Sequence, residues 1–160
     1  MKICYAYIDK FYNNDVSISL TKHEREHILG RKVTIDVAKS FYGIDDEIVI
    51  DGKRPHFKHN EIYFSISHSE NIVAVVFDNC PVGIDVEFVK PRKLDKLIKR
   101  YNLDDKHQSL DDFYRWWTAY EAKYKNPSGK VISTFRILPE YICSISANEK
   151  CTLVPEEITF

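Results

Sequence analysis

The sequence predicts an α+β protein, because segments with the two-residue period of β-strands occur beside segments with a helical period. Alternating apolar and polar residues, separated by Gly, Pro and Asn, predict strands over residues 2–8, 47–50, 61–67, 72–77, 82–88, 131–137 and 141–147. Apolar stripes predict helices over residues 21–43, 94–101 and 109–126. A chain of 160 residues with 44% hydrophobic content can bury one core. We expect one compact unit with an N-terminal half, residues 1–88, and a C-terminal half, residues 89–160.

The long helix of the N-terminal half has clear signals at both ends. Thr21 followed by Glu24 has the pattern of a capping box, and Gly43 is a plausible stop. The apolar stripe between them recurs every four residues, at Leu29, Val33, Val37 and Phe41. We expect this stripe to pack on the sheet.

The last helix is unusually aromatic. Ser109 is a candidate cap, and Pro127 marks the limit of the helix. The aromatic side chains lie on one stripe, at Phe113, Trp116, Trp117, Tyr120 and Tyr124. Core packing is the expected role of such a stripe, and contact of Tyr114 or Trp116 with a partner protein is the alternative.

The composition argues against several kinds of partner. The chain has 23 Lys and Arg against 24 Asp and Glu, so its overall charge favours neither nucleic acid nor a membrane surface. The first residues lack the charged and apolar regions of a signal peptide, so we expect a cytoplasmic protein. The 4 cysteines are widely spaced, so we expect reduced thiols without a zinc-thiolate site. A monomer is expected.

Two carboxylates form the first candidate site. Asp85 and Glu87 follow Gly83 in a predicted strand, where residues two apart share one face. Such carboxylates repel unless a cation lies between them, which favours a hard cation and a phosphorylated ligand. Glu121 could add a third carboxylate and complete part of the octahedron of Mg²⁺. Taken alone, the pair suits a solvated strand edge, and Glu121 with Lys125 suits a surface ion pair.

Hydroxyl and basic groups elsewhere could hold the phosphates of such a ligand. Ser67 and His68 end a predicted strand and can donate to phosphate oxygens. Arg54 and Pro55 lie in the segment Gly-Lys-Arg-Pro-His-Phe, residues 52–57, where cations adjoin a rigid turn residue. That segment suits a nucleotide phosphate and an exposed loop equally.

In their order along the chain, these motifs resemble the 4′-phosphopantetheinyl transferase superfamily, in its surfactin-synthetase-activator (Sfp-like) branch. The motifs are Lys/Arg-Pro-x-Phe, Phe-Ser-Ile-Ser-His-Ser, Val-Gly-Ile-Asp-Val-Glu and Trp-Thr-Ala-Tyr-Glu-Ala-Lys-Tyr-Lys, within residues 52–125. The resemblance implies two similar α/β halves related by a pseudo-twofold, in a short version, with coenzyme A between them. It implies an enzyme that transfers 4′-phosphopantetheine from coenzyme A to a serine of an acyl or peptidyl carrier protein, releasing adenosine 3′,5′-bisphosphate.

The resemblance also implies a role for each candidate residue. Mg²⁺ on the pyrophosphate of coenzyme A would be held by Asp85, Glu87 and Glu121. The residues implied in binding coenzyme A are Lys22, Arg54, Pro55, Ser67, His68 and Lys125. Those implied in catalysis are Glu121, Lys125 and His68. Glu121 is our candidate for the base that takes the serine proton, because neighbouring carboxylates raise one another's pKa. Tyr120 stands where the family usually has a basic residue.

Two other functions compete with this interpretation. A descendant that binds coenzyme A or a carrier protein without catalysis would keep the same fold. His23, Glu24 and His27 satisfy the His-Glu-x-x-His pattern of zinc proteases on a predicted helix. The charged residues between the two histidines and Val33 at the position of a third histidine argue against a protease.

Overall fold

The computed structural model describes residues 1–12, 19–52, 54–103, 109–150 and 154–160, and it confirms the α+β class. The helices are α1 (Ile8–Tyr12), α2 (Lys22–Tyr42), α3 (Leu94–Tyr101) and α4 (Leu110–Lys125). The strands are β1 (Lys2–Tyr7), β2 (Ile48–Asp51), β3 (Arg54–Phe57), β4 (Tyr63–Ser69), β5 (Ile72–Asp78), β6 (Gly83–Phe88), β7 (Val131–Leu138), β8 (Tyr141–Ala147) and β9 (Glu156–Glu157).

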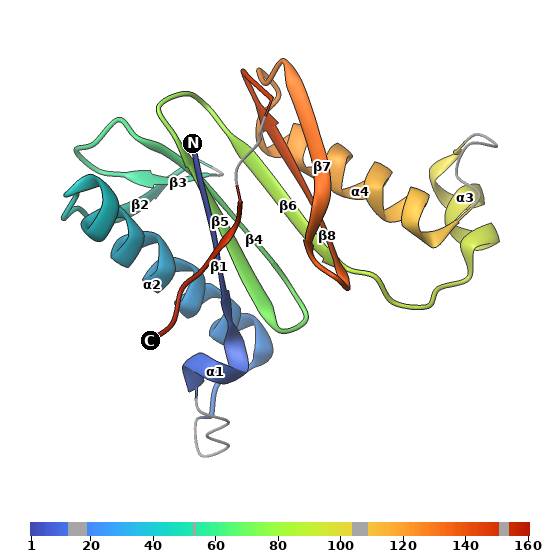
Figure 1. Ribbon diagram of the computed structural model, residues 1–160, viewed down its shortest axis with the longest axis horizontal. Coiled ribbons are helices and arrows are strands. Elements are labelled where there is room, and N and C mark those ends of the chain that lie inside the picture. Colours follow the sequence, from blue (N-terminus) through green and yellow to red (C-terminus); the bar gives the residue numbers. More distant parts are fainter. Residues whose placement is uncertain (13–18, 53, 104–108, 151–153) are drawn as a thin grey trace.

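The described strands form two main sheets, each covered by a helix on its outer face (Figure 1). One sheet has the order β4-β5-β1-β9 with α2 against it, and the other has the order β6-β8-β7 with α4 against it. Strands β2 and β3 form a separate hairpin. Strand β6 thus pairs with β8 of the second half, and β9, near the end of the chain, pairs with β1.

The core follows from the two faces of β5, which is buried along nearly its whole length. Val73, Val75 and Phe77 face α2, where they pack with its apolar stripe. The alternate residues, Ile72, Ala74 and Val76, pack against apolar residues of β6 and β8. A strand between two apolar layers has a continuous hydrophobic sequence, as residues 72–77 do.

The two sheets meet where β4 and β6 lie side by side. Three hydroxyl oxygens on β4 accept hydrogen bonds of 3.2, 3.2 and 3.1 Å from backbone N–H groups of β6: Ser65 from Ile84, Ser67 from Val86, and Ser69 from Phe88. These side chains satisfy an edge of β6 that would otherwise lack partners. They also fix Asp85 and Glu87 opposite the β4 residues Ser67 and Ser69.

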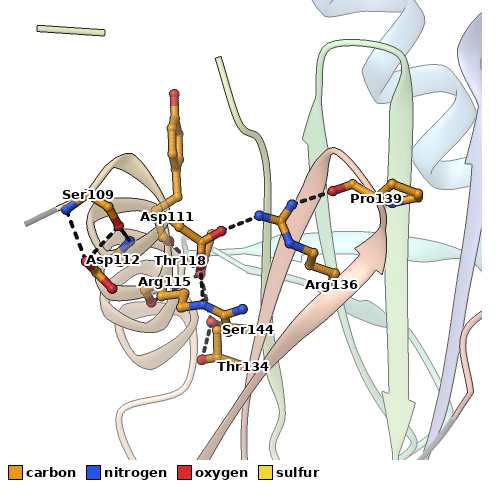
Figure 2. Close-up of polar contacts among 10 residues, drawn as sticks. Ser109, Asp111, Asp112, Arg115, Thr118, Thr134, Arg136, Pro139 and Ser144 are labelled. Carbon is orange, nitrogen blue, oxygen red and sulfur yellow. Dashed lines mark hydrogen bonds and ion pairs between the residues drawn. The ribbon is translucent and has the colours of Figure 1, made fainter. Parts of the chain in front are cut away.

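Polar side chains anchor α4 on β7 and β8, as Figure 2 shows. The hydroxyl oxygens of Thr118 and Thr134 each lie 2.8 Å from that of Ser144, in a chain, buried at Thr118 and partly buried at Thr134, that joins the helix to both strands. Arg136 on β7 donates to the carboxylate of Asp111 on the first turn of α4. Because these contacts set the position of α4, they also set that of the residues at its far end, Glu121 and Lys125.

The predicted signals at the helix ends are confirmed. Thr21 and Glu24 form both hydrogen bonds of a capping box, and Gly43 ends α2 with a left-handed φ of 66°. Ser109 caps α4 and forms a second capping box with Asp112, which sequence analysis did not predict.

Several local predictions were incomplete. Helix α1 and strand β9 are too short to give a periodic signal, and β3 has the composition of a loop but pairs with β2. Phe41, predicted to continue the buried stripe of α2, is 50% exposed, because it lies on the last turn and its ring is covered by the ammonium group of Lys2 instead. Tyr120 and Tyr124 are 54% and 62% exposed, so only part of the aromatic stripe packs in the core.

No helix in the described part of the chain is long and apolar enough to cross a membrane.

Candidate functional site

Asp85 is the most buried carboxylate of the candidate site, with 7% of its surface exposed. Its Oδ1 accepts hydrogen bonds from the hydroxyl of Ser67 at 3.0 Å and from Nζ of Lys125 at 2.9 Å. Its Oδ2 is buried and has no hydrogen-bond partner among the described residues. Burial raises the pKa of Asp85 above its usual range, and Lys125 and Ser67 oppose this shift.

Lys125 connects α4 to both sheets. Besides Asp85, its Nζ donates to the carbonyl oxygen of Ile84 on β6 at 2.8 Å and approaches that of Ile66 on β4 at 3.5 Å. An ammonium group on the last turn of a helix also interacts favourably with the helix dipole. The side chain keeps 30% of its surface exposed, so the cation is held in place and still faces solvent.

Glu87 and Glu121 complete the acidic cluster predicted from sequence. Glu87 accepts a hydrogen bond of 2.8 Å from the hydroxyl of Ser69, and burial raises its pKa, with a further contribution from Asp85. Burial also raises the pKa of Glu121, and the charge of Asp85 adds to the shift while Lys125 opposes it. All three carboxylates therefore lie in an environment that disfavours their ionised forms.

The chemistry of this cluster fits a hard cation such as Mg²⁺. Asp85, Glu87 and Glu121 offer only oxygen ligands, and the unpaired Oδ2 of Asp85 is a buried acceptor of the kind that a metal ion would satisfy. The three carboxylates do not form a closed ligand set. Among the described residues, only His23, Glu26 and His68 bring three potential ligand atoms within 4.8 Å of one another.

A cleft of about 910 Å³ lies next to the acidic cluster. Arg54 and Pro55 on β3 line one side and Lys125 lines another, so the cleft brings together three residues predicted to bind the same ligand. The guanidinium group of Arg54 donates to the carbonyl oxygen of Tyr124 at 3.3 Å, which links β3 to the end of α4. Lys53, part of the same sequence motif, lies outside the described residues.

The other residues predicted to bind the ligand do not line this cleft, and each already contacts another side chain: Ser67, His68 and Lys22. The hydroxyl of Ser67 is buried, donates to Asp85 and accepts from the backbone N–H of Val86, so its role is to position Asp85. His68 has 34% of its side chain exposed, and burial lowers its pKa. Lys22 on α2 lies 3.3 Å from a carboxylate oxygen of Glu70 and is connected to His68 through Glu26.

The His-Glu-x-x-His pattern, residues 23–27, does not have the arrangement that hydrolysis by a zinc protease requires. Glu24, the residue that would act as general base, accepts hydrogen bonds from the backbone and the hydroxyl of Thr21 at the start of α2. These bonds lower the pKa of Glu24, which makes its carboxylate a weaker base. His68 on β4 approaches His23 and His27 from outside the motif, with ring centroids 6.3 and 6.4 Å away.

Two further residues position the site, although sequence analysis did not identify their roles. A Cβ at Gly83 would lie 2.4 Å from the carbonyl oxygen of Ala122, so this glycine allows α4 to approach β6. Asn126, directly after α4, is buried, and its amide donates to the carbonyl oxygens of Pro81 at 2.8 Å and Ser146 at 2.9 Å. The sequence offered two signals for these roles: a glycine, Gly83, directly before Ile84 and Asp85, and an asparagine, Asn126, directly after the predicted helix.

The acidic cluster, with Lys125 and Arg54 at the neighbouring cleft, offers oxygen ligands and cations that suit a phosphorylated ligand. Known proteins similar to this chain are 4′-phosphopantetheinyl transferases by name. The chain is 37% identical over 101 residues to a Haemophilus influenzae protein named as a candidate 4′-phosphopantetheinyl transferase, a match that covers 54% of this chain and 43% of that protein. It is 30% identical over 120 residues to a Bacillus subtilis 4′-phosphopantetheinyl transferase, covering 66% and 53%.

A third relative, the 4′-phosphopantetheinyl transferase Sfp of Bacillus subtilis strain 168, is 35% identical over 82 residues, covering 46% of this chain and 36% of that protein. The chain thus spans about half or less of the length of these relatives. No protein-family model matches it. The resemblance to 4′-phosphopantetheinyl transferases that the motifs predicted is confirmed.

Proposed function

We propose that the protein transfers 4′-phosphopantetheine from coenzyme A to a serine of an apo acyl or peptidyl carrier protein, with release of adenosine 3′,5′-bisphosphate. The observation that carries the proposal is the contact between Lys125 and the buried Asp85 beside the cleft lined by Arg54. A cation and a set of hard oxygen ligands there suit the pyrophosphate of coenzyme A. The near-zero net charge supports a protein that binds neither nucleic acid nor a membrane surface. A cytoplasmic location and a monomeric state are further parts of the proposal.

The adenine end of the substrate would lie in the cleft, and its phosphates would extend beyond it toward His68 and Lys22, which do not line the cleft. Arg54 and Pro55 would contact the adenine side of coenzyme A, and Lys22 its 3′-phosphate. His68 and Lys125 would donate to oxygens of the pyrophosphate, with His68 held in place by Glu26 and Ser67 supporting Asp85 from β4. Donors that are fixed before the reaction stabilise developing negative charge at little reorganisation cost.

Asp85, Glu87 and Glu121 are the residues that would hold Mg²⁺. When bound, this ion would offset negative charge on the pyrophosphate. Glu121 would also take the proton of the attacking serine, because burial and the charge of Asp85 raise its pKa toward the range of a useful base.

Replacing Glu121 by Gln tests its role as base. We expect transfer at saturating Mg²⁺ to fall by about 10²–10⁴-fold, the usual contribution of a general base. Glu140→Gln is a matched control, because Glu140 is exposed in the turn between β7 and β8 and does not line the cleft. A near wild-type rate in Glu121→Gln would assign the base to another group.

The pseudo-twofold relation between the halves is also part of the proposal. It is supported by the arrangement of one long helix on the outer face of each sheet, α2 on one and α4 on the other (Figure 1). We retain residues 1–88 and 89–160 as the proposed halves, with β6 and β9 as strands that pair across this boundary.

One assay separates the proposed enzyme from a non-catalytic binding protein. The protein is incubated with coenzyme A, Mg²⁺ and a panel of apo-carrier proteins, and the carriers are analysed by intact mass. A phosphopantetheine adduct supports the transferase. Binding of coenzyme A without an adduct on any carrier would favour the binding protein, and cleavage of a peptide substrate in the presence of zinc would favour the protease.

A further inference from the structure

A cluster of potential metal ligands lies between α2 and β4. It shares His68 with the proposed coenzyme A site but includes none of the three carboxylates Asp85, Glu87 and Glu121. One ligand atom from each of His23, Glu26 and His68 lies within 4.8 Å of the others. His23 and Glu26 are three residues apart on α2, so their side chains lie on neighbouring positions of one helix face. His68 reaches the same point from β4, and its Nδ1 lies 3.2 Å from Oε2 of Glu26. The ligands of the cluster therefore lie on two regular elements, the helix α2 and the strand β4.

The charge environment of Glu26 favours a bound cation. Its side chain is only 7% exposed, and it pairs at 3.8 Å with Nζ of Lys22, a side chain that is 59% exposed and lies closer, at 3.3 Å, to Glu70. A carboxylate held inside the protein next to one distant ammonium group and an imidazole is incompletely compensated by charge.

We propose that His23, Glu26 and His68 form a binding site for a divalent transition metal, with Zn²⁺ as the best match. Two imidazoles and one carboxylate are a common zinc ligand set that leaves a fourth position open. Zinc with bonds of about 2.0–2.1 Å in tetrahedral geometry requires ligand atoms about 3.3 Å apart. His23 is exposed and His68 is partly exposed, so small side-chain rotations can close the remaining distance.

This site differs from the His-Glu-x-x-His pattern, although the two share His23. The sequence pattern would use His23 and His27, whose rings lie 4.5 Å apart on α2, while Glu24 is engaged by Thr21. The site proposed here uses Glu26 and recruits His68 from β4. The two arrangements predict opposite effects of substitutions at positions 26 and 27.

Zinc binding to the full chain tests the proposal. Wild-type protein is titrated with Zn²⁺ by calorimetry, and Co²⁺ is used as a spectroscopic probe of coordination. We expect one ion per chain, absorption bands of a low-coordinate Co²⁺ site, and a higher midpoint of thermal unfolding with Zn²⁺ present. His23→Ala and Glu26→Gln should each weaken binding by at least about tenfold.

His59→Ala is the matched control, because His59 is 73% exposed and is bonded to Asp46 outside the cluster. It should bind Zn²⁺ like wild type. Loss of binding in His27→Ala with retention in Glu26→Gln would overturn the proposal in favour of the helical histidine pair. Absence of Zn²⁺ binding to the wild-type chain would also overturn it. Because His23 is exposed, His23→Ala remains informative if Glu26→Gln fails to fold.

Discussion

Substitution of Gly83 by alanine tests whether the close approach of α4 to β6 sets the geometry of the site. The added Cβ would lie 2.4 Å from the carbonyl oxygen of Ala122 and 2.9 Å from the backbone nitrogen of Asn126. Because non-bonded atoms prefer separations of about 3.5 Å, the end of α4 must move away from β6 by about 1 Å. That shift would lengthen the contact of 2.9 Å between Lys125 and Asp85 to about 4 Å.

We expect Gly83→Ala to lower stability by about 1–3 kcal/mol, the usual cost of overpacking. Transfer should fall by about 100-fold, because a displacement of about 1 Å removes the alignment of catalytic groups. Stability is measured by urea unfolding and transfer by the intact mass of the carrier. Gly30→Ala is the control: its Cβ would lie 3.0 Å from a methyl group of Ile66, a side chain that can yield without movement of backbone. A Gly83→Ala protein with wild-type stability and rate would refute the reasoning.

Two other substitutions test the electrostatics of the site. Lys125→Met should lower the free energy of unfolding by about 2 kcal/mol. This loss is below the usual range for breaking a fully buried ion pair, because the side chain of Lys125 is 30% exposed. The same variant should lower the rate of transfer at least about 100-fold. In the control Lys39→Met, which breaks an exposed pair, the loss should stay below about 1 kcal/mol in urea unfolding. An equal loss in both variants would contradict this account.

Glu87→Gln should stabilise the metal-free protein at neutral pH. Burial raises the pKa of folded Glu87, so its favourable contribution is complete below about 4.5, its unfolded value, and is lost as the pH rises through the folded pKa. The difference between variant and wild type in urea unfolding should therefore shrink as the pH falls to about 4.5. A difference in stability between Glu87→Gln and wild type that stays constant from neutral pH to about 4.5 would contradict a raised pKa of Glu87.

Most secondary structure could be predicted from sequence because its signals are local. The period of the apolar residues located the long helices and most strands, and Thr21, Ser109 and Gly43 marked helix ends through hydrogen bonds that span only a few residues. Elements without local repetition were missed. Strand β9 has two residues and exists only through its pairing with β1. Strand β4 extends to Ser69, beyond its predicted end, because it continues to pair with β5.

The candidate site could be predicted only as a set of residues, since its contacts depend on tertiary packing. Sequence placed Asp85 and Glu87 on one face of a strand, but it did not indicate that Ser67 would bond to Asp85 or that Asn126 would hold the end of α4. The spacing of residues along the chain also did not predict the contact between Glu26 and His68, because that contact joins α2 to β4.

The most direct test of the central proposal is the intact mass of an apo-carrier protein after incubation with this chain and coenzyme A, with Mg²⁺ or with a chelator. The account predicts a phosphopantetheine adduct on the carrier serine with Mg²⁺, and loss of the adduct with chelator or in Asp85→Asn. An adduct that forms equally fast with chelator would contradict the role of the carboxylates in holding Mg²⁺. No adduct on any carrier of the panel would contradict the proposed activity.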